Sequence, residues 1–163
     1  MFDIYDISWE DAEDFIMTLN AMGEGSYTFP TEAQWEYAAR AGSNKAFTNG
    51  DISNTTTDSN LDVMGWYASN SGSTTHAVAQ KQPNAWGLYD MHGNVLDWCQ
   101  DWYGSYPDIS ITDPGGASSG SARVCRGGSW YYYAEHCRSA HRGSGSPGGR
   151  THDIGLRLSR TLY

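Results

Sequence analysis

The sequence has little positive charge and no long apolar run. It contains only two lysines among 163 residues, and its formal net charge is −9 at pH 7. Binding to a phosphate backbone is driven by clustered lysine and arginine, so this composition argues against a nucleic-acid partner. No apolar stretch reaches the roughly 18 residues that a membrane-spanning helix needs, so we expect no membrane span in this chain.

Cysteine is also scarce. The three cysteines, Cys99, Cys125 and Cys137, are too few for a disulfide-stapled scaffold, and their number is odd. One disulfide with one free thiol is compatible with this count, and so are three buried thiols. The sequence therefore leaves the disulfide state and the redox compartment open.

Aromatic residues and glycine are abundant instead. The chain holds 7 Trp, 11 Tyr, 4 Phe and 19 Gly. High aromatic content argues against intrinsic disorder, and the length is that of one domain, which we assign to residues 1–163. We interpret the tryptophans mostly as packing in the core and between loops.

Helical patterns are confined to the N-terminal quarter of the chain. Residues 9–22 place apolar side chains at helical spacing behind Ser8, a typical N-cap. Thr31 and Gln34 have the spacing of a capping box for a second helix. The region 48–76 reads as loop, and the order of elements predicts an α+β fold. Short strands are expected at 95–98, 122–125 and 155–159.

The segment 131–153 is unusual in composition. It contains no Val, Ile, Leu, Met, Phe or Trp, but it has three Tyr and three His. Such a segment cannot supply a conventional core, yet core-like residues lie on both sides of it, at 127–130 and 154–158. A polar segment held at both ends is typical of a surface loop or a displayed face, and such loops commonly carry function.

Four motifs resemble those of one protein family. Residues 29–40 read FPTEAQWEYAAR, 84–95 read NAWGLYDMHGNV, 126–130 read RGGSW and 154–157 read IGLR. In this order, and over nearly the whole chain, they resemble the signature blocks of the formylglycine-generating-enzyme (sulfatase-modifying-factor) family. The resemblance implies a C-type-lectin-like fold with two N-terminal helices, a small twisted antiparallel sheet and long loops.

The enzymes of this family oxidise a substrate cysteine with a copper-binding pair of cysteines. The resemblance places the first cysteine of that pair on Tyr132 and the second on Cys137. One thiolate cannot reproduce a two-sulfur site for Cu(I), and Cys125 precedes the Gly-Gly-Ser turn and is a poor substitute. We therefore expect no copper and no catalysis. A thiol- or copper-dependent oxidase, or a degenerate relative of one, is the alternative.

A second branch of C-type-lectin-like proteins matches better. Diversity-generating retroelements of bacteria and phages rewrite the last segment of a variable protein, and the mutations fall on adenines, typically in Asn codons. The resemblance implies that Tyr, His, Asp, Ser, Gly and Thr arise at such codons, whereas Lys, Glu, Gln, Met and Trp do not. The positions that fit are Tyr131, Tyr132, Tyr133, His136, His141, Gly143, Ser144, Gly145, Ser146, Gly148, Gly149, Thr151, His152 and Asp153.

The residues between these positions would form a constant scaffold. The hypothesis is a non-enzymatic protein that presents a variable region, 131–153, to a protein or cell-surface ligand. The alternative is an ordinary surface loop, as in a structural domain of a phage tail or surface protein. A bacterial cell surface or a phage virion would suit a variable protein, although the sequence does not reveal the compartment. The constant residues are Cys137, Arg138, Ser139, Ala140, Arg142, Pro147, Arg150 and Ile154.

Tyr, Ser and Gly are suitable residues for a binding surface. Tyr offers a large contact area while fixing only two side-chain torsions, and Ser and Gly add adaptable hydrogen bonding. Alternation along an extended chain predicts Tyr131 and Tyr133 on one exposed face, with Tyr132 on the other. The histidines of the segment lack any known metal-ligand spacing, so we expect them to be surface residues.

A calcium site is predicted within the block at 84–95 and just after it. The resemblance implies that the side chain of Asp90, the carbonyls of Gly93 and Val95 and the carboxylate of Asp97 hold the ion. Hard oxygen ligands from one tight loop suit Ca²⁺. Asp97 is shorter than the glutamate usual there, which would weaken the site. The alternative is a hydrogen-bonded turn in which Asp90 caps nearby amides.

Overall fold

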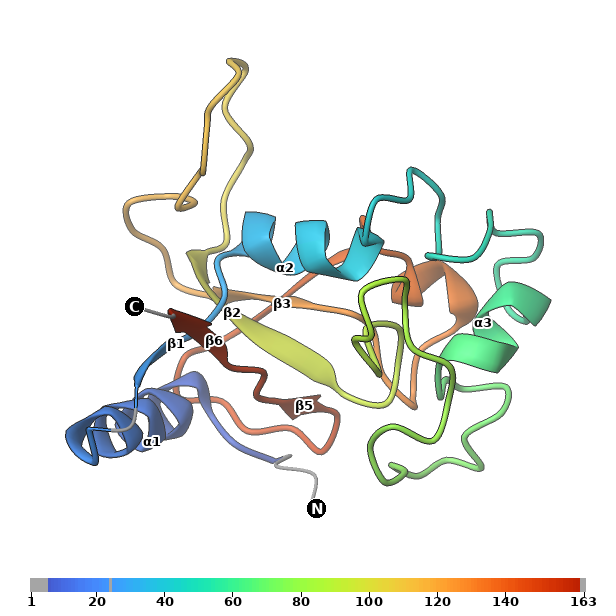
Figure 1. Cartoon of the computed structure of the whole chain (residues 1–163), viewed down its shortest axis with the longest axis horizontal. Helices are drawn as coiled ribbons and strands as arrows, with labels where there is room; N and C mark the ends of the chain where they lie inside the picture. The colour runs from blue at the N-terminus through green and yellow to red at the C-terminus, as the bar shows by residue number, and fades with distance from the viewer. Residues whose placement is uncertain (1–5, 24, 162–163) are drawn as a thin grey trace.

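The computed structural model describes residues 6–23 and 25–161, and it has the expected α+β fold (Figure 1). The helices are α1 (Trp9–Ala21), α2 (Glu32–Arg40) and α3 (Ser59–Met64), with a short 3-10 helix, η1 (Ala134–Cys137). The strands are β1 (Ser26–Thr28), β2 (Leu96–Trp102), β3 (Arg123–Arg126), β4 (Arg142–Gly145), β5 (Ile154–Gly155) and β6 (Ser159–Thr161).

Both predicted helices begin at the capping residues that the sequence indicates. The Ser8 hydroxyl accepts a hydrogen bond from the Asp11 amide, and the Asp11 carboxylate accepts one from the Ser8 amide. Thr31 and Gln34 form the same reciprocal pair at the start of α2. Each capping box satisfies amide groups that the first turn of a helix leaves without partners.

The main sheet has the strand order β4-β3-β2-β5, and β1 and β6 form a separate two-stranded sheet. β3 runs antiparallel to both β2 and β4, whereas β5 runs parallel to β2. The expected antiparallel sheet is confirmed for β2, β3 and β4, and β5 adds one parallel strand at its edge. The chain reaches β5 only after the long segment 131–153, and a connection of that length permits parallel pairing.

Two of the three predicted strands are correct in place but not in extent. The strands expected at 95–98 and 122–125 correspond to β2 and β3, and β2 continues as far as Trp102. The strand expected at 155–159 is wrong, because the chain divides there between the end of β5 and the start of β6.

The predicted loop at 48–76 contains one helix, α3. The buried side chain of Asp58 caps it by accepting hydrogen bonds from the amides of Asn60 and Leu61. A helix of six residues is too short to show the periodicity by which helices are recognised in a sequence.

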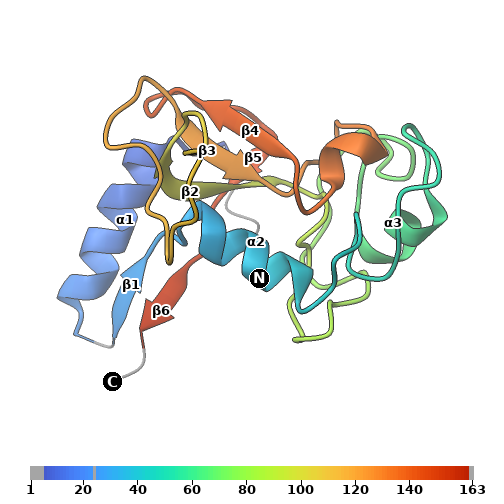
Figure 2. The same ribbon diagram turned by 90° about the horizontal axis from the view of Figure 1, so that it is seen from above.

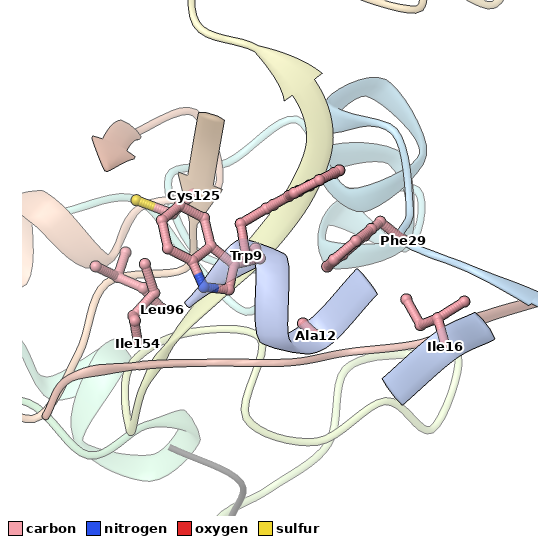
Figure 3. Close-up of a cluster of buried hydrophobic side chains, with 8 residues drawn as sticks. Trp9, Ala12, Ile16, Phe29, Leu96, Cys125 and Ile154 are labelled. Carbon is pink, nitrogen blue, oxygen red and sulfur yellow. The ribbon is translucent and has the colours of Figure 1, made fainter. Parts of the chain in front are cut away.

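The two long helices cover opposite faces of the sheet. On β2, Leu96 and Trp98 pack into the cluster of α1, together with Cys125 of β3 (Figure 3). Cys99 of β2 and Val124 of β3 pack instead into the cluster of α2. Successive residues of a strand point to opposite faces, so the sheet lies between the two helices (Figures 1 and 2).

A third cluster lies at the other end of the molecule, near α3 and η1. It contains Phe47, Leu61, Tyr67, Ala134 and Cys137. All three cysteines of the chain are free and buried.

Most tryptophans pack as expected, but Trp86 does not. Trp9, Trp35 and Trp98 are buried, whereas Trp86 is 48% exposed and touches the ring of Tyr37 edge-on. None of the described helices has the length and apolar character needed to cross a membrane.

Candidate ligand-binding face

Backbone hydrogen bonds hold both ends of the segment 131–153. The Trp130 amide donates to the carbonyl of Asn94, and the Leu96 amide donates to the carbonyl of Asp153, each over 2.8 Å. Between these ends the chain forms η1 and then β4, which pairs with β3 through four residue pairs. The path of the segment thus rests largely on bonds that do not depend on its side chains.

The proposed contact positions all reach the surface to some extent. None of the fourteen is buried, and Tyr131 and Tyr133 are 68% and 54% exposed. Tyr132 turns inward and packs against both the α1 cluster and the cluster near α3. The predicted alternation of the three tyrosines is therefore confirmed. The other exposed positions are Ser144, Ser146, Gly148, Thr151 and His152.

The residues between these positions include the buried ones. Cys137, Ser139 and Ile154 are buried, whereas Arg138 and Pro147 are half-buried. Ala140 is exposed, so its proposed place in the scaffold has no support from burial. Each of the other proposed constant residues is at least partly buried or is bonded to the rest of the molecule.

Two arginines of the constant set anchor the segment to the helices. Arg142 forms a bidentate pair with the buried carboxylate of Glu32, with nitrogen–oxygen distances of 2.6 and 2.8 Å. Arg150 binds Asp11 in the same way, at 2.6 and 2.7 Å. Hydrogen bonds from Arg150, followed by those from Ser8, hold the pKa of Asp11 well below its usual range. Bidentate pairs of this kind fix orientation as well as charge.

A cavity of about 300 Å³ opens within the segment, on the α1 side of the sheet. Its walls come from Tyr132, His136, His141, Asp153 and several residues of 143–151. Its floor consists of side chains of the α1 cluster, three of which lie together in Figure 3. The floor residues are Leu96, Trp98, Cys125 and Ile154. Ten of the fourteen proposed contact positions line this cavity, and Tyr131 and Tyr133 border a second hollow of about 450 Å³.

Glycine at positions 143 and 145 lets β4 pack directly against the core side chains beneath it. A Cβ at Gly145 would lie 2.6 Å from the ring of Trp98, and a Cβ at Gly143 would lie 2.8 Å from the Cys125 sulfur. Other residues at these two positions would require β4 to move. At Gly148 the nearest atom is the flexible end of Glu10, at 3.3 Å, so a side chain there has room.

Three of the titratable groups around the cavity, His141, Cys125 and Tyr132, are held in their neutral forms. Burial, followed by the charges of His136 and nearby arginines, lowers the pKa of His141 to about 4. Burial raises the pKa of Cys125 to about 12, and burial with the charge of Asp153 raises the pKa of Tyr132. A thiol of this kind is a poor nucleophile, because the thiolate is the reactive form.

The position matched to the second catalytic cysteine of the family lies in the core. Cys137 is fully buried next to Gly128, and burial raises its pKa to about 12. Its carbonyl is 2.9 Å from Nδ1 of His92, which is itself buried. Tyr132, at the position matched to the first cysteine, brings a phenol to the cavity wall.

The residues of the predicted calcium site lie together ahead of and within β2. One oxygen of Asp90 accepts a hydrogen bond from the Ala79 amide, and the other, Oδ1, is buried without a hydrogen-bond partner. Burial raises the pKa of Asp90. Oδ2 of Asp97 is already bonded to Trp35 and Arg157. Asp90 therefore fits a cation ligand well, whereas Asp97 has only its other oxygen to offer.

A larger hollow was not foreseen from the sequence. It measures about 740 Å³ and lies between α2 and the loop 104–117, which projects from the body of the protein (Figure 1). Tyr37, Tyr106 and Ile111 border it and are exposed. The two walls are about seventy residues apart in the chain, and no local pattern indicates that they meet.

The fold and these motifs define the family. The family model of the sulfatase-modifying factor enzyme 1-like domain matches residues 4–162, so the chain belongs to this family. Its relatives include the formylglycine-generating enzyme of Streptomyces coelicolor, which is 34% identical over 94% of this chain and 51% of that protein.

Among solved structures, the chain is similar to Treponema denticola variable protein 1. The two are 43% identical with a TM-score of 0.75, and the match covers 82% of this chain and 47% of that protein. PvdO from Pseudomonas aeruginosa is also similar, with 28% identity, a TM-score of 0.84 and coverage of 97% of this chain and 61% of the other. The chain thus spans about half the length of these relatives.

Proposed function

We propose that this chain is a non-enzymatic display protein, in which residues 131–153 form a diversified surface that binds a protein or cell-surface ligand. One observation carries the proposal. Within a single segment, the positions that retroelement mutagenesis can alter reach the surface, and the residues between them include the buried and anchored ones. The similarity to a protein named for its variability supports the same function.

The scaffold would let side chains change while the backbone stays in place. Hydrogen bonds to Asn94, Leu96 and β3 hold the main chain, and ion pairs to Glu32 and Asp11 hold it against the helices. Tyr131 and Tyr133 then supply exposed, rigid contact area next to a hollow. Aromatic anchors beside pockets commonly dominate binding energy at protein interfaces.

The gene's surroundings test this proposal. We expect a reverse-transcriptase gene nearby, together with a near-identical copy of the coding sequence for 131–153 that differs from it at adenines. The differences should fall in the codons of the proposed contact positions and spare those of Cys137, Arg142 and Ile154. A locus without a reverse transcriptase and such a copy would contradict the proposal.

The competing function is that of a copper-dependent oxidase, since relatives of this chain are named as formylglycine-generating enzymes. Such an enzyme needs two sulfur ligands within reach of one copper ion. Titration with Cu(I) under anaerobic conditions separates the two functions. Our proposal predicts no stoichiometric binding. A one-to-one complex that is lost in Cys137→Ser would favour the oxidase.

We also propose that the loop 90–97 binds Ca²⁺ as a structural ion. The support is the buried Asp90 Oδ1, which has no hydrogen-bond partner and is an oxygen that a cation would satisfy. Carbonyl oxygens of Gly93 and Val95 and the free oxygen of Asp97 would complete the ligand set. The ion would hold the turn before β2, against which residues 127 and 130 are bonded.

A further inference from the structure

The cavity in the segment 131–153 has the size of a site for one side chain. Its volume of about 300 Å³ is at the lower end of the roughly 300–1,000 Å³ usual for ligand pockets. Its lining includes Gly143 and Gly145, which have no side chains to fill it, and their backbone packs directly on Cys125 and Trp98. A single long side chain from a partner would therefore fit, whereas a folded element would not.

The cavity carries one full charge, the carboxylate of Asp153. Among the described residues that line it, Asp153 is the only acid, and none is a lysine or an arginine. In the described part of the chain, no cation lies within ion-pair distance of this carboxylate, whose one side-chain contact is with the Ser129 hydroxyl at 3.3 Å. Its backbone carbonyl is fixed by the Leu96 amide, so the carboxylate is held at the cavity.

The nearby arginines are already engaged elsewhere. Arg126 binds Glu36 and the carbonyl of His141, and Arg142 binds Glu32. Arg138 donates to the carbonyl of Glu135. Because no cation among the described residues pairs with it, the Asp153 carboxylate is available to a cation from a partner.

Aromatic rings form much of the remaining wall. Tyr132, His136 and His141 stand in a row, with ring centroids 5.6 Å apart in the first pair and 4.7 Å in the second. The pKa of His141 is lowered to about 4, so this ring is uncharged at neutral pH. Neutral aromatic faces attract ammonium and guanidinium groups.

From this arrangement we propose that the cavity binds the cationic side chain of a lysine or arginine of the protein ligand. The charged head pairs with Asp153, and the aliphatic stem lies along the aromatic wall above Gly143 and Gly145. This inference rests on the proposed function, because it names the chemical group that the displayed surface takes. The strong net negative charge of the chain, −9, also favours the approach of a basic partner.

The test is a titration of the 163-residue chain, followed by nuclear magnetic resonance, with N-acetyl-lysine methylamide and N-acetyl-arginine methylamide. The neutral N-acetyl-norleucine methylamide, which has the four-carbon stem of lysine without its ammonium group, serves as the control. We expect the cationic probes to shift the amides of Gly143 and Gly145 and the indole of Trp98 in a saturable way. The norleucine probe should bind about tenfold more weakly, because it lacks the charge-assisted hydrogen bond.

Two matched variants test which carboxylate binds the cationic probe. Asp153→Asn keeps the shape and the backbone bond and should weaken binding of the lysine probe about tenfold. Asp6→Asn removes an acid at the same edge, where Asp6 lies 3.5 Å from His152 without lining the cavity, and should leave binding unchanged. The amide spectra of both variants report directly whether they are folded.

Three results would overturn the proposal: equal binding of norleucine and lysine probes, unchanged binding in Asp153→Asn, or no shift at the cavity. None of these results would bear on the display function. That function would still stand if the gene lies beside a reverse transcriptase and its adenine-biased copy. Conversely, if the cavity binds cations but the gene lacks such a locus, the proposed cation site stands and the proposed diversification is contradicted.

Discussion

β3 and β4 pair through four residue pairs, yet the two central residues of β3 are Val and Cys, whereas those of β4 are Gly and Ser. β3 reads Arg-Val-Cys-Arg and is buried along most of its length, whereas β4 reads Arg-Gly-Ser-Gly and is half-buried except at Ser144, which is exposed. Both strands share one hydrogen-bond ladder. A strand can therefore be held by its neighbour's backbone while its own side chains contribute little to the core, which leaves them free to serve another purpose.

The pairing also shows where β4 does depend on side chains. Arg126 of β3 and Arg142 of β4 face each other directly, and the buried carboxylate of Glu32 lies near both guanidinium groups. Like charges opposite each other destabilise a sheet, and Glu32 offsets this repulsion together with Glu36. One acid on α2 thus holds the scaffold strand and the display strand together.

The largest effect is expected for Glu32→Gln. Loss of this carboxylate leaves two guanidinium groups close together with less countercharge, and breaking a buried ion pair costs about 3–5 kcal/mol of unfolding free energy. Urea unfolding measures the loss. Glu135→Gln, which removes an acid 43% exposed within the segment 131–153, should change stability by less than about 0.5 kcal/mol. Similar small losses in both variants would show that the anchor is unimportant.

Local signals were sufficient to predict much of the scaffold. Ser8 and Thr31 mark their helices because a capping residue acts within one turn, and β2 and β3 carry apolar residues on both faces. β4 was missed, because Arg-Gly-Ser-Gly shows no strand pattern and becomes a strand through the ladder of β3. α3 was missed because one turn and a half of helix leaves no periodic trace.

The candidate face was predicted in its positions but not in its shape. The exposure of Tyr131 and Tyr133, with Tyr132 turned inward, is as predicted from an extended chain, but the chain there is a turn, closed by a hydrogen bond from the Tyr132 amide to the Ser129 carbonyl. The cavity could not be predicted, because its floor comes from Leu96 and Trp98, far away in the sequence. The limits on Gly143 and Gly145 are likewise visible only once those neighbours are in place.

A second prediction compares a histidine of the scaffold with one of the face. Burial lowers the pKa of His92 to about 4, so the folded protein holds this imidazole neutral. The unfolded chain binds its proton near pH 6.5, so this contribution to stability is complete above pH 6.5 and is lost as the pH falls toward 4. The raised pKa values of Asp90 and Asp101 favour the folded state as the pH falls, so they reduce the net loss of stability.

We expect the His92 contribution to fall by about 2 kcal/mol between pH 7 and pH 5, as measured by urea unfolding at the two values. His92→Gln should remove this contribution and leave that of His141, whose pKa is also lowered to about 4. His152→Gln, at a residue whose side chain is 81% exposed, should leave the pH dependence as in the parent protein. The same pH dependence in His92→Gln as in the parent protein would contradict the account of His92.

Calcium should have a smaller effect, and one confined to the scaffold. At a free concentration ten times its Kd, a single bound ion adds about 1.4 kcal/mol of stability. Thermal unfolding with calcium and with a chelator measures the difference, which should vanish in Asp90→Ala and persist in Asp108→Ala, a change at an exposed acid. An unchanged melting temperature in the parent protein would exclude the proposed ion.

The smallest effect on stability, and the most direct test of the central claim, concerns the displayed side chains themselves. A library randomises the seven exposed proposed positions together: Tyr131, Tyr133, Ser144, Ser146, Gly148, Thr151 and His152. A control library randomises Cys137, Ser139, Arg142 and Ile154. Melting temperatures of members drawn from each library are then compared.

A replaceable face on an independent scaffold predicts that most members of the first library melt within roughly 5 °C of the parent and that most of the second do not fold. If the first library unfolds as widely as the second, residues 131–153 belong to the scaffold, and the claim of a display surface is contradicted.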